Sequence, residues 1–488
     1  MSTQDETNLV LAAEDFDEAD FNRLHRFSRN DERVISKLMA HGPVLLQGSR
    51  GSGKSALMRA AAERLAADQS ALGVYISLRH MPLLRSYGDE YHRILCQIVV
   101  DKVQRAAAPI AFDSDHSLTS LQTELTDLSE RLGKRIVLMF DDAAHIGRES
   151  SLGEFFDVFR TLSSSSVSCK AAIYPGVTNF GKRFDVYNDA TVVEVIRDEE
   201  QEDFGEVFTD VLRARFPLLV SRRFSPELDI KSFAWFLGKS VLGNMRSFIF
   251  ACNSVTESSE SLVGLSSLTN SFLELATNFY WPLLEEVKPK LGKYTPVVDT
   301  STEIAEAIFE ECGREKNPSV IVHREIISRL SKAFEILEYV GFLSKREASK
   351  GMKSGGRGSR YALNLCLLLE KIPGSRLTSD IYEEWRSKPK EPTQIHSKGA
   401  LLSSLKLPEL PAEDVELEIF TEPVDALKKS NAYPYGLSDA LVARLHEGSV
   451  YTVGQLYSAS EEELDALHYI GLTRARHMKN LVAQAIWL

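Results

Sequence analysis

The segment that most constrains the fold is an eight-residue loop, Gly48-Ser49-Arg50-Gly51-Ser52-Gly53-Lys54-Ser55, which fits the pattern G-x-x-x-x-G-K-[ST]. An apolar run at 43–47 precedes it, and a sequence rich in helix formers follows at 55–65. Glycines allow successive backbone N–H groups to surround phosphate oxygens at the start of a helix, so the pattern predicts a triphosphate site in an α/β fold. We expect Lys54 to contact the β- and γ-phosphates and Ser55 to ligate Mg²⁺. A glycine turn that only caps a helix is the alternative.

Further apolar runs at 73–77, 135–140, 170–174 and 191–195, separated by helical patterns, predict a parallel sheet buried on both faces. The run at 135–140 ends in Asp141 and Asp142. A carboxylate at a strand end completes the metal site of a phosphate loop. We expect Asp141 to ligate Mg²⁺ and Asp142 to polarise the attacking water. A turn that happens to contain two acids is the alternative.

The rest of the chain divides by its breaks and composition. Strand signals stop after residue 196, and 321–361 reads as helices followed by strand, polar loop and strand, which is the order of a winged helix. Prolines at 389, 392, 408 and 411 indicate a linker. The expected units are an acidic tail at 1–26, a nucleotide-binding core at 27–195, a helical lid at 196–258, a helical connector at 259–317, a winged helix at 318–371, a linker at 372–424 and an all-α domain at 425–488.

The net charge of the chain averages over a strongly acidic segment and a strongly basic one. The chain has 57 Lys and Arg against 69 Asp and Glu, a formal charge of −12 that by itself argues against nucleic acid. The first twenty residues hold seven acids and no Lys or Arg, whereas 342–361, the expected wing, hold six cations and one acid, or +5. The wing cations are Lys345, Arg346, Lys350, Lys353, Arg357 and Arg360. One-sided charge on a glycine-rich loop suits DNA phosphates, and a solvated loop is the alternative.

Cysteine usage and the N-terminus indicate the compartment. Five scattered cysteines lack the C-x-x-C spacing of a zinc or redox site, so we expect buried thiols in a reducing environment. The first residues are acidic, whereas a signal or transit peptide would be basic. No apolar run approaches the roughly 20 residues of a membrane span. We therefore expect a cytoplasmic protein without a membrane partner.

The motifs together resemble a known family. The strand, phosphate loop and helix, the acidic strand end about ninety residues later and the helical lid resemble an AAA+ ATPase. With a winged helix behind the lid, the order is similar to that of the origin-recognition initiators and the STAND signalling ATPases. The resemblance implies ATP and Mg²⁺ as cofactors.

The same resemblance implies roles for further residues. Thr178 or Asn179, after the strand at 170–174, would monitor the γ-phosphate, and Arg246 in Gly243-Asn244-Met245-Arg246 would reach the phosphates from the lid. Arg183 would act as an arginine finger in a neighbouring subunit, with solvated surface charge as the alternative. The family's second acid is typically Glu. Asp142 is one methylene shorter, which places its carboxylate about 1 Å further from the water and predicts slow hydrolysis.

The C-terminal segment resembles paired helix-hairpin-helix units and is similar to the C-terminal domain of the RNA polymerase alpha subunit. We expect Ser458 to cap a helix, with Glu461 three residues on. Tyr469 stands where DNA-binding members have the first hairpin glycine, which leaves Gly471 alone. DNA contact through Arg474, Arg476 and Lys479 and docking to a protein are left as equal alternatives.

Two functions follow from the sequence. The first is a slowly hydrolysing ATP switch that couples nucleotide state to DNA binding through the wing. The second is a STAND-like regulatory subunit that controls a protein effector, for instance in a prokaryotic defence or mobile-element system. A DNA-assembled loader or transposition regulator is less favoured. We expect an effector partner or a homo-oligomer in either case.

Overall fold

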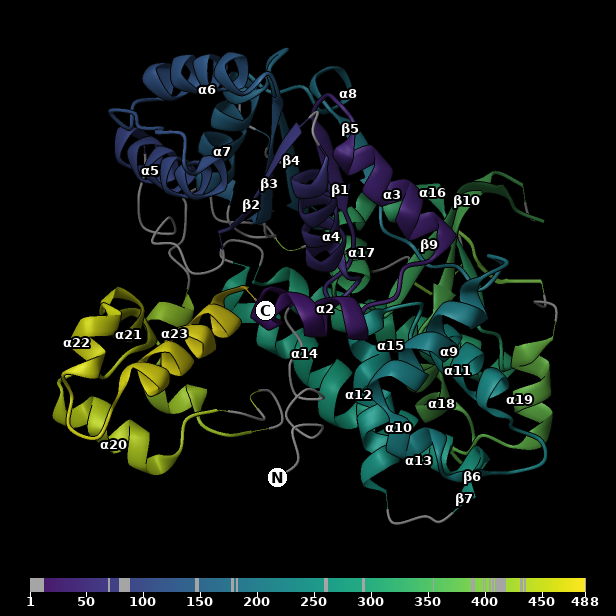
Figure 1. The fold of residues 1–488 in the computed structure, drawn as a ribbon. Helices are drawn as coiled ribbons and strands as arrows, with labels where there is room; N and C mark the ends of the chain where they lie inside the picture. The colour runs from purple at the N-terminus through teal and green to yellow at the C-terminus, as the bar shows by residue number, and fades with distance from the viewer. Residues whose placement is uncertain are drawn as a thin grey trace.

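Figure 1 shows the fold in the computed structural model of the 488-residue chain. The structure describes residues 13–68, 71–78, 88–144, 149–176, 183–258, 262–291, 295–353, 355–387, 391–397, 418–430 and 436–487, with single residues at 180, 399, 401, 402, 405, 408 and 433. Among these residues, none of the helices is long and apolar enough to cross a membrane. All five cysteines are free and buried, as their spacing predicts.

The nucleotide-binding core is a five-stranded parallel sheet in the order β2-β3-β4-β1-β5. Its strands are β1 (Val44–Gln47), β2 (Ala71–Ser77), β3 (Arg135–Ala144), β4 (Val167–Ile173) and β5 (Thr191–Glu194). Alternate side chains of each strand point to opposite faces. On β1, Leu45 packs in the cluster formed with α5 (Gly88–Ala107), α6 (Leu118–Leu132) and α7 (Glu149–Leu162), while Val44 and Leu46 pack with α3 (Arg29–Met39) and α4 (Lys54–Ala67). The predicted α/β class, with a sheet buried on both faces, is confirmed.

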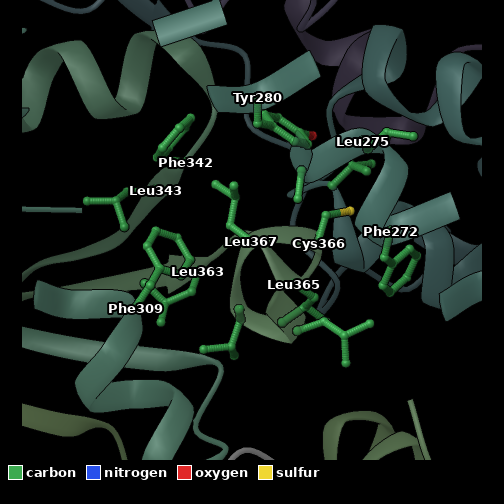
Figure 2. Close-up of a cluster of buried hydrophobic side chains, with 14 of the residues drawn as sticks. Phe272, Leu275, Tyr280, Phe309, Phe342, Leu343, Leu363, Leu365, Cys366 and Leu367 are labelled. Atoms are coloured by element: carbon green, nitrogen blue, oxygen red, sulfur yellow. The ribbon is translucent and has the colours of Figure 1, made fainter. Parts of the chain in front are cut away.

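The segments expected as lid, connector and winged helix share one hydrophobic core. The lid contains α9 (Phe204–Arg215), α11 (Ile230–Ser240) and α12 (Met245–Glu257). The segment expected as a winged helix contains α16 (Arg324–Arg329), α17 (Ser331–Val340), β9 (Leu343–Gly351) and β10 (Arg357–Leu363). It is preceded by α15 (Val297–Glu315), in the expected connector, and by β8 (Ser319–His323), a strand that the sequence pattern did not predict. Figure 2 shows Leu365, Cys366 and Leu367 of α18 (Leu365–Lys371) among Phe272, Leu275 and Tyr280 of the expected connector and Phe342, Leu343 and Leu363 of the expected winged helix. Because the core is continuous, we treat lid and winged helix as one packed body.

Two segments expected outside the domains contribute to the packed structure. In the expected linker, α19 (Ser379–Arg386) buries Trp385, whose Nε1 donates to Lys316 O at 3.0 Å, and β11 (Thr393–Ile395) pairs in parallel with β8. In the expected tail, the helix α2 (Glu18–Leu24) buries Phe21 and Leu24 against the core.

The C-terminal domain has its own hydrophobic core. Its elements are η7 (Val424–Leu427), α20 (Asp439–Glu447), α21 (Val453–Ser458), α22 (Glu461–Asp465) and α23 (Leu472–Trp487). The expected cap is displaced by two residues: Ser460 and Glu463 form the capping box of α22, whereas Ser458 ends α21. Both serines have an acid three residues later, so spacing alone does not separate them.

Candidate nucleotide site

The phosphate loop joins β1 to α4 in the geometry that its glycines permit. Gly51 and Gly53 have φ values of 80° and 95°, the left-handed region that glycine adopts without strain. A Cβ on Gly51 would lie 2.7 Å from both Arg246 Cβ and Asn244 Oδ1, so the lid approaches the loop too closely for a side chain. Helix α4 begins at Lys54, and its first N–H groups therefore face the loop interior.

Lys54 is buried at the centre of the site. Its Nζ donates to Gly48 O at 2.8 Å and Ser49 O at 3.1 Å and lies 3.8 Å from the centre of the Tyr174 ring. Burial lowers the pKa of Lys54 to about 7, against the opposing effect of the Asp142 and Asp141 carboxylates. The ammonium thus lacks a fully neutralising partner, and this is the environment in which a phosphate would raise its pKa.

The two acids at the end of β3 have different surroundings. Asp141 is buried, its Oδ2 accepts from Tyr75 Oη at 2.5 Å and its Oδ1 accepts from the backbone N of Asp142 at 3.0 Å. Asp142 lines the cavity with Lys54 and Ser55, and its Oδ1 accepts from Tyr174 Oη at 3.1 Å. The φ of Asp142, 53°, is left-handed, and such strain is often found at functional positions. The acid that faces the cavity is therefore Asp142, whereas Asp141, which we expected to ligate Mg²⁺, is absent from the cavity lining.

The lid closes the other side of the cavity through the segment expected to contact the phosphates. Arg246 lines the cavity, and its backbone N donates to Gly51 O at 3.2 Å. Asn244 caps α12 and donates from Nδ2 to Arg50 O at 2.6 Å. Arg246 thus lies beside the phosphate loop of its own chain.

Arg197 is a cavity residue that the sequence did not reveal. It follows β5, is buried, and donates from Nε and Nη2 to Asp31 at 3.2 and 3.0 Å and from Nη1 to Ser52 O at 2.5 Å. The pair joins α3, the phosphate loop and the entry to the lid. Its only sequence signal is a cation just beyond a strand end, which is too common to be informative.

Helix α17, in the segment expected as a winged helix, packs on the nucleotide site. Arg50 N donates to Tyr339 O at 3.1 Å, and Lys332 Nζ donates to Gly176 O, just beyond β4, at 2.5 Å. The ring of Tyr339 meets that of Tyr174 edge-on at 5.1 Å. A chain of contacts therefore runs from α17 through Tyr174 to both Lys54 and Asp142.

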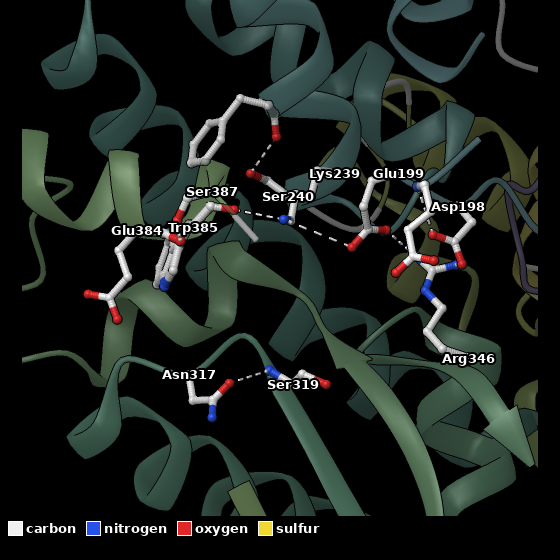
Figure 3. Close-up of polar contacts among 12 residues, drawn as sticks. Asp198, Glu199, Lys239, Ser240, Asn317, Ser319, Arg346, Glu384, Trp385 and Ser387 are labelled. Carbon is white, nitrogen blue, oxygen red and sulfur yellow. Dashed lines mark hydrogen bonds and ion pairs between the residues drawn. The ribbon is translucent and has the colours of Figure 1, made fainter. Parts of the chain in front are cut away.

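The wing cations are engaged within the chain. Arg346 is buried and pairs with Glu199 at 3.0 Å and Asp198 at 3.7 Å (Figure 3). The other contacts are Lys345 with Glu338, Lys350 and Arg360 with Glu347, Lys353 with Glu391, and Arg357 with the hydroxyl and carbonyl of Ser349. Only Lys353 and Arg357 of the six are largely exposed, so the local excess of +5 counted from sequence is reduced by acids that folding brings in.

The remaining expected residues are Arg183, which would act on a neighbouring subunit, and Thr178 or Asn179. Arg183 is exposed, and its carbonyl accepts from Arg160, while it is absent from the residues that line the cavity. Thr178 and Asn179 lie outside the residues that the structure describes.

Comparison with known proteins adds structural neighbours. No family model matches the sequence, and no curated protein sequence matches it. Cdc6p from Pyrobaculum aerophilum is 11% identical, with 74% of this chain and 99% of that one covered and a TM-score of 0.34. The ORC2 protein of Aeropyrum pernix is 11% identical, with 76% and 96% covered and a TM-score of 0.39. The A. pernix ORC1 protein in complex with DNA is 15% identical, with 76% and 98% covered and a TM-score of 0.32.

The TM-scores of these superpositions are too low to support a conclusion about this chain. The assignment of the fold therefore rests on the geometry of the site itself. A parallel sheet presents a glycine loop, a buried lysine and an acidic strand end to one cavity, and a helical lid with Arg246 closes it. The chain thus has an α/β fold whose parallel sheet, phosphate loop and helical cover form a P-loop nucleotide-binding core.

Proposed function

We propose that this protein is an ATP-binding, slowly hydrolysing switch that couples nucleotide state to DNA binding through its winged helix. The observation that carries the proposal is the direct packing of α17 on the phosphate loop, through Arg50 N and Tyr339 O. A change in the loop on nucleotide binding cannot leave that contact untouched. Nucleotide occupancy and the position of the winged helix are therefore coupled.

Each cavity residue has a proposed task. Lys54 exchanges its two carbonyl partners, Gly48 and Ser49, for phosphate oxygens, and the loop N–H groups and Arg246 bind the remaining charge. The Ser55 hydroxyl and the Asp142 carboxylate line the same cavity and are the hard oxygen ligands that suit Mg²⁺. The metal ion, when bound, neutralises phosphate charge. Asp141, already bonded to Tyr75, positions Asp142 through the backbone N–H of Asp142.

The winged helix is held away from DNA in the arrangement described. Most of α17 is buried, and the wing cations contact acids and carbonyls of the same chain. We propose that ATP, by drawing Lys54 and the loop toward phosphate, weakens the docking of α17. The wing, released from its contacts with the chain's own acids, then contacts the DNA backbone.

Fluorescence anisotropy on a random duplex over a salt series, with and without ATP, tests this function. We expect ATP to raise DNA affinity, Lys54→Ala to remove that effect, and Lys350→Glu/Lys353→Glu/Arg357→Glu to lower affinity and flatten the salt dependence. The matched control is Lys37→Glu/Arg213→Glu/Lys231→Glu, which makes the same charge change at exposed positions outside the wing. Equal effects of the two triple variants would contradict a role for the wing.

A regulatory subunit for a protein effector is the second candidate. The engagement of the wing cations by the chain's own acids favours it, because such pairs reduce the charge available to DNA. DNA affinity that is negligible in both nucleotide states, together with intact ATP binding, supports this candidate over the first.

A further inference from the structure

The cavity at the phosphate loop extends past the loop to an apolar end. There it is lined by Leu24 at the end of α2, by Phe27 just after it, and by Val211 and Ile249 from the lid. Such walls suit a flat heteroaromatic ring. Two polar side chains, His25 and Arg215, line this same cavity.

Arg215 brings an unused donor to this cavity. The residue is 6% exposed, and its Nη1 is buried without a hydrogen-bond partner among the described residues. Its guanidinium carbon lies 5.1 Å from the centre of the Phe16 ring. Burial lowers the pKa of Arg215 to about 10, which still leaves it charged near neutral pH. A buried cation with an unsatisfied N–H is costly unless a ligand completes it.

The imidazole of His25 provides a hydrogen-bond acceptor, its Nε2. Its Nδ1 lies 3.0 Å from Phe21 O, which can only accept, so Nδ1 carries the proton and Nε2 is left with a lone pair. Burial, followed by the charges of Arg215 and Arg59, lowers the pKa of His25 to about 4 and keeps the ring neutral. The ring is fixed by stacking on Phe21 at 4.2 Å.

The segment that carries His25 is held by the phosphate-loop helix itself. Arg59 of α4 donates from Nη1 to Phe16 O at 2.8 Å and to Ala13 O at 2.6 Å, and its guanidinium covers the ring of Phe21 at 4.3 Å. The position of His25 and the apolar end of the cavity is therefore linked to the position of the phosphate loop. A ligand that fills both parts of the cavity requires such a link.

We infer that His25 and Arg215 read the base of the bound nucleotide and select adenine. The exocyclic amino group donates to His25 Nε2, and a ring nitrogen next to it accepts from Arg215. Adenine presents this donor beside an acceptor, whereas guanine and hypoxanthine have the acceptor O6 in place of the amino group, facing the lone pair of His25. The inference rests on the proposed nucleotide binding and adds its base specificity.

Isothermal titration calorimetry with ATP, inosine triphosphate and purine riboside triphosphate, which lacks the amino group, tests this. For the wild-type chain we expect ATP to bind about tenfold more tightly than either analogue, the effect of one lost hydrogen bond at a buried site. His25→Leu should weaken ATP about tenfold and leave both analogues within about twofold, so that the preference disappears. Arg215→Met should weaken all three ligands. Arg213→Met, an exposed change on the same helix, is the control.

The outcomes separate the inference from the function on which it rests. If no triphosphate binds, the proposed function fails and the inference fails with it. If ATP binds but the wild-type chain does not prefer it to the analogues, or if His25→Leu keeps the preference, only the base assignment is wrong. The two analogues probe the folded wild-type chain, so this result does not depend on the stability of a variant.

Discussion

Replacing Arg197 by Met should destabilise the core strongly, because it breaks a buried ion pair from one side. The side chains of Arg197 and Asp31 are 5% and 2% exposed, and the guanidinium makes bonds of 3.0 and 3.2 Å to the carboxylate and one of 2.5 Å to Ser52 O. Removing one partner of such a pair costs about 3–5 kcal/mol. Asp31 keeps its bond from Ser28 N at 2.9 Å, so we expect about 3 kcal/mol.

The neighbouring residue provides the matched control. Glu32 also forms a bidentate ion pair, with Arg64, at 2.5 and 2.8 Å, but the side chains of Glu32 and Arg64 are 46% and 41% exposed. Arg64→Met should therefore cost no more than about 1 kcal/mol. Urea unfolding followed by circular dichroism gives both values, and the double variant Asp31→Asn/Arg197→Met should be less destabilised than the sum of its single changes.

The reasoning is refuted if Arg197→Met is no more destabilising than Arg64→Met. Additive single changes at Asp31 and Arg197 would equally show that the two groups do not interact. Nucleotide should partly restore the stability of Arg197→Met, since ligand binding to the folded state adds its own free energy.

Three further predictions concern the site and the fold. Because the Lys54 ammonium binds phosphate and its pKa is about 7 in the free protein, ATP affinity should fall as pH rises from 7 to 9, and binding at pH 8 should take up about one proton, measured by calorimetry in buffers of different ionisation enthalpy. Tyr174→Phe removes the hydroxyl that orients Asp142, the proposed Mg²⁺ ligand, and should slow ATP turnover roughly tenfold while ATP affinity measured without Mg²⁺ stays within about twofold, in phosphate-release and binding assays. Trp385→Ala should lower the free energy of unfolding by about 3–5 kcal/mol, because the indole is buried; a change within about 1 kcal/mol in urea titrations would show that α19 is not packed on the domain.

The sequence predicted the core well because its signals are local. The loop from Gly48 to Ser55 needs glycines at fixed positions, and the strands need unbroken apolar runs, so both features are visible without knowledge of the fold. The order of two helices, a strand, a loop and a strand at 324–363 was visible in the same way, whereas the strand β8 before it was not. Where two local signals compete, as at Ser458 and Ser460, the pattern alone does not choose, and the turn after α21 decides which serine caps α22.

Residues that act through distant partners were not predictable in this way. Arg197 is paired with Asp31, 166 positions earlier, and His25 and Arg215 meet only because α2 packs on the lid helix α9. The charge of the wing was counted correctly from the sequence. The count did not show that Arg346 forms ion pairs with Asp198 and Glu199, which lie far away in the chain. A count along the chain includes only sequence neighbours, whereas Coulomb energy depends on distance.

The sequence by itself determined that the chain forms a parallel sheet with a phosphate loop and an acidic strand end, since periodicity and glycine placement are properties of short segments. Tertiary structure alone decided which acid faces the cavity, that α17 lies on the phosphate loop, and that the segment after α2 covers the apolar end of the cavity. These are relations between surfaces far apart in the chain. They are set by which apolar faces bury one another, and no local pattern encodes that choice.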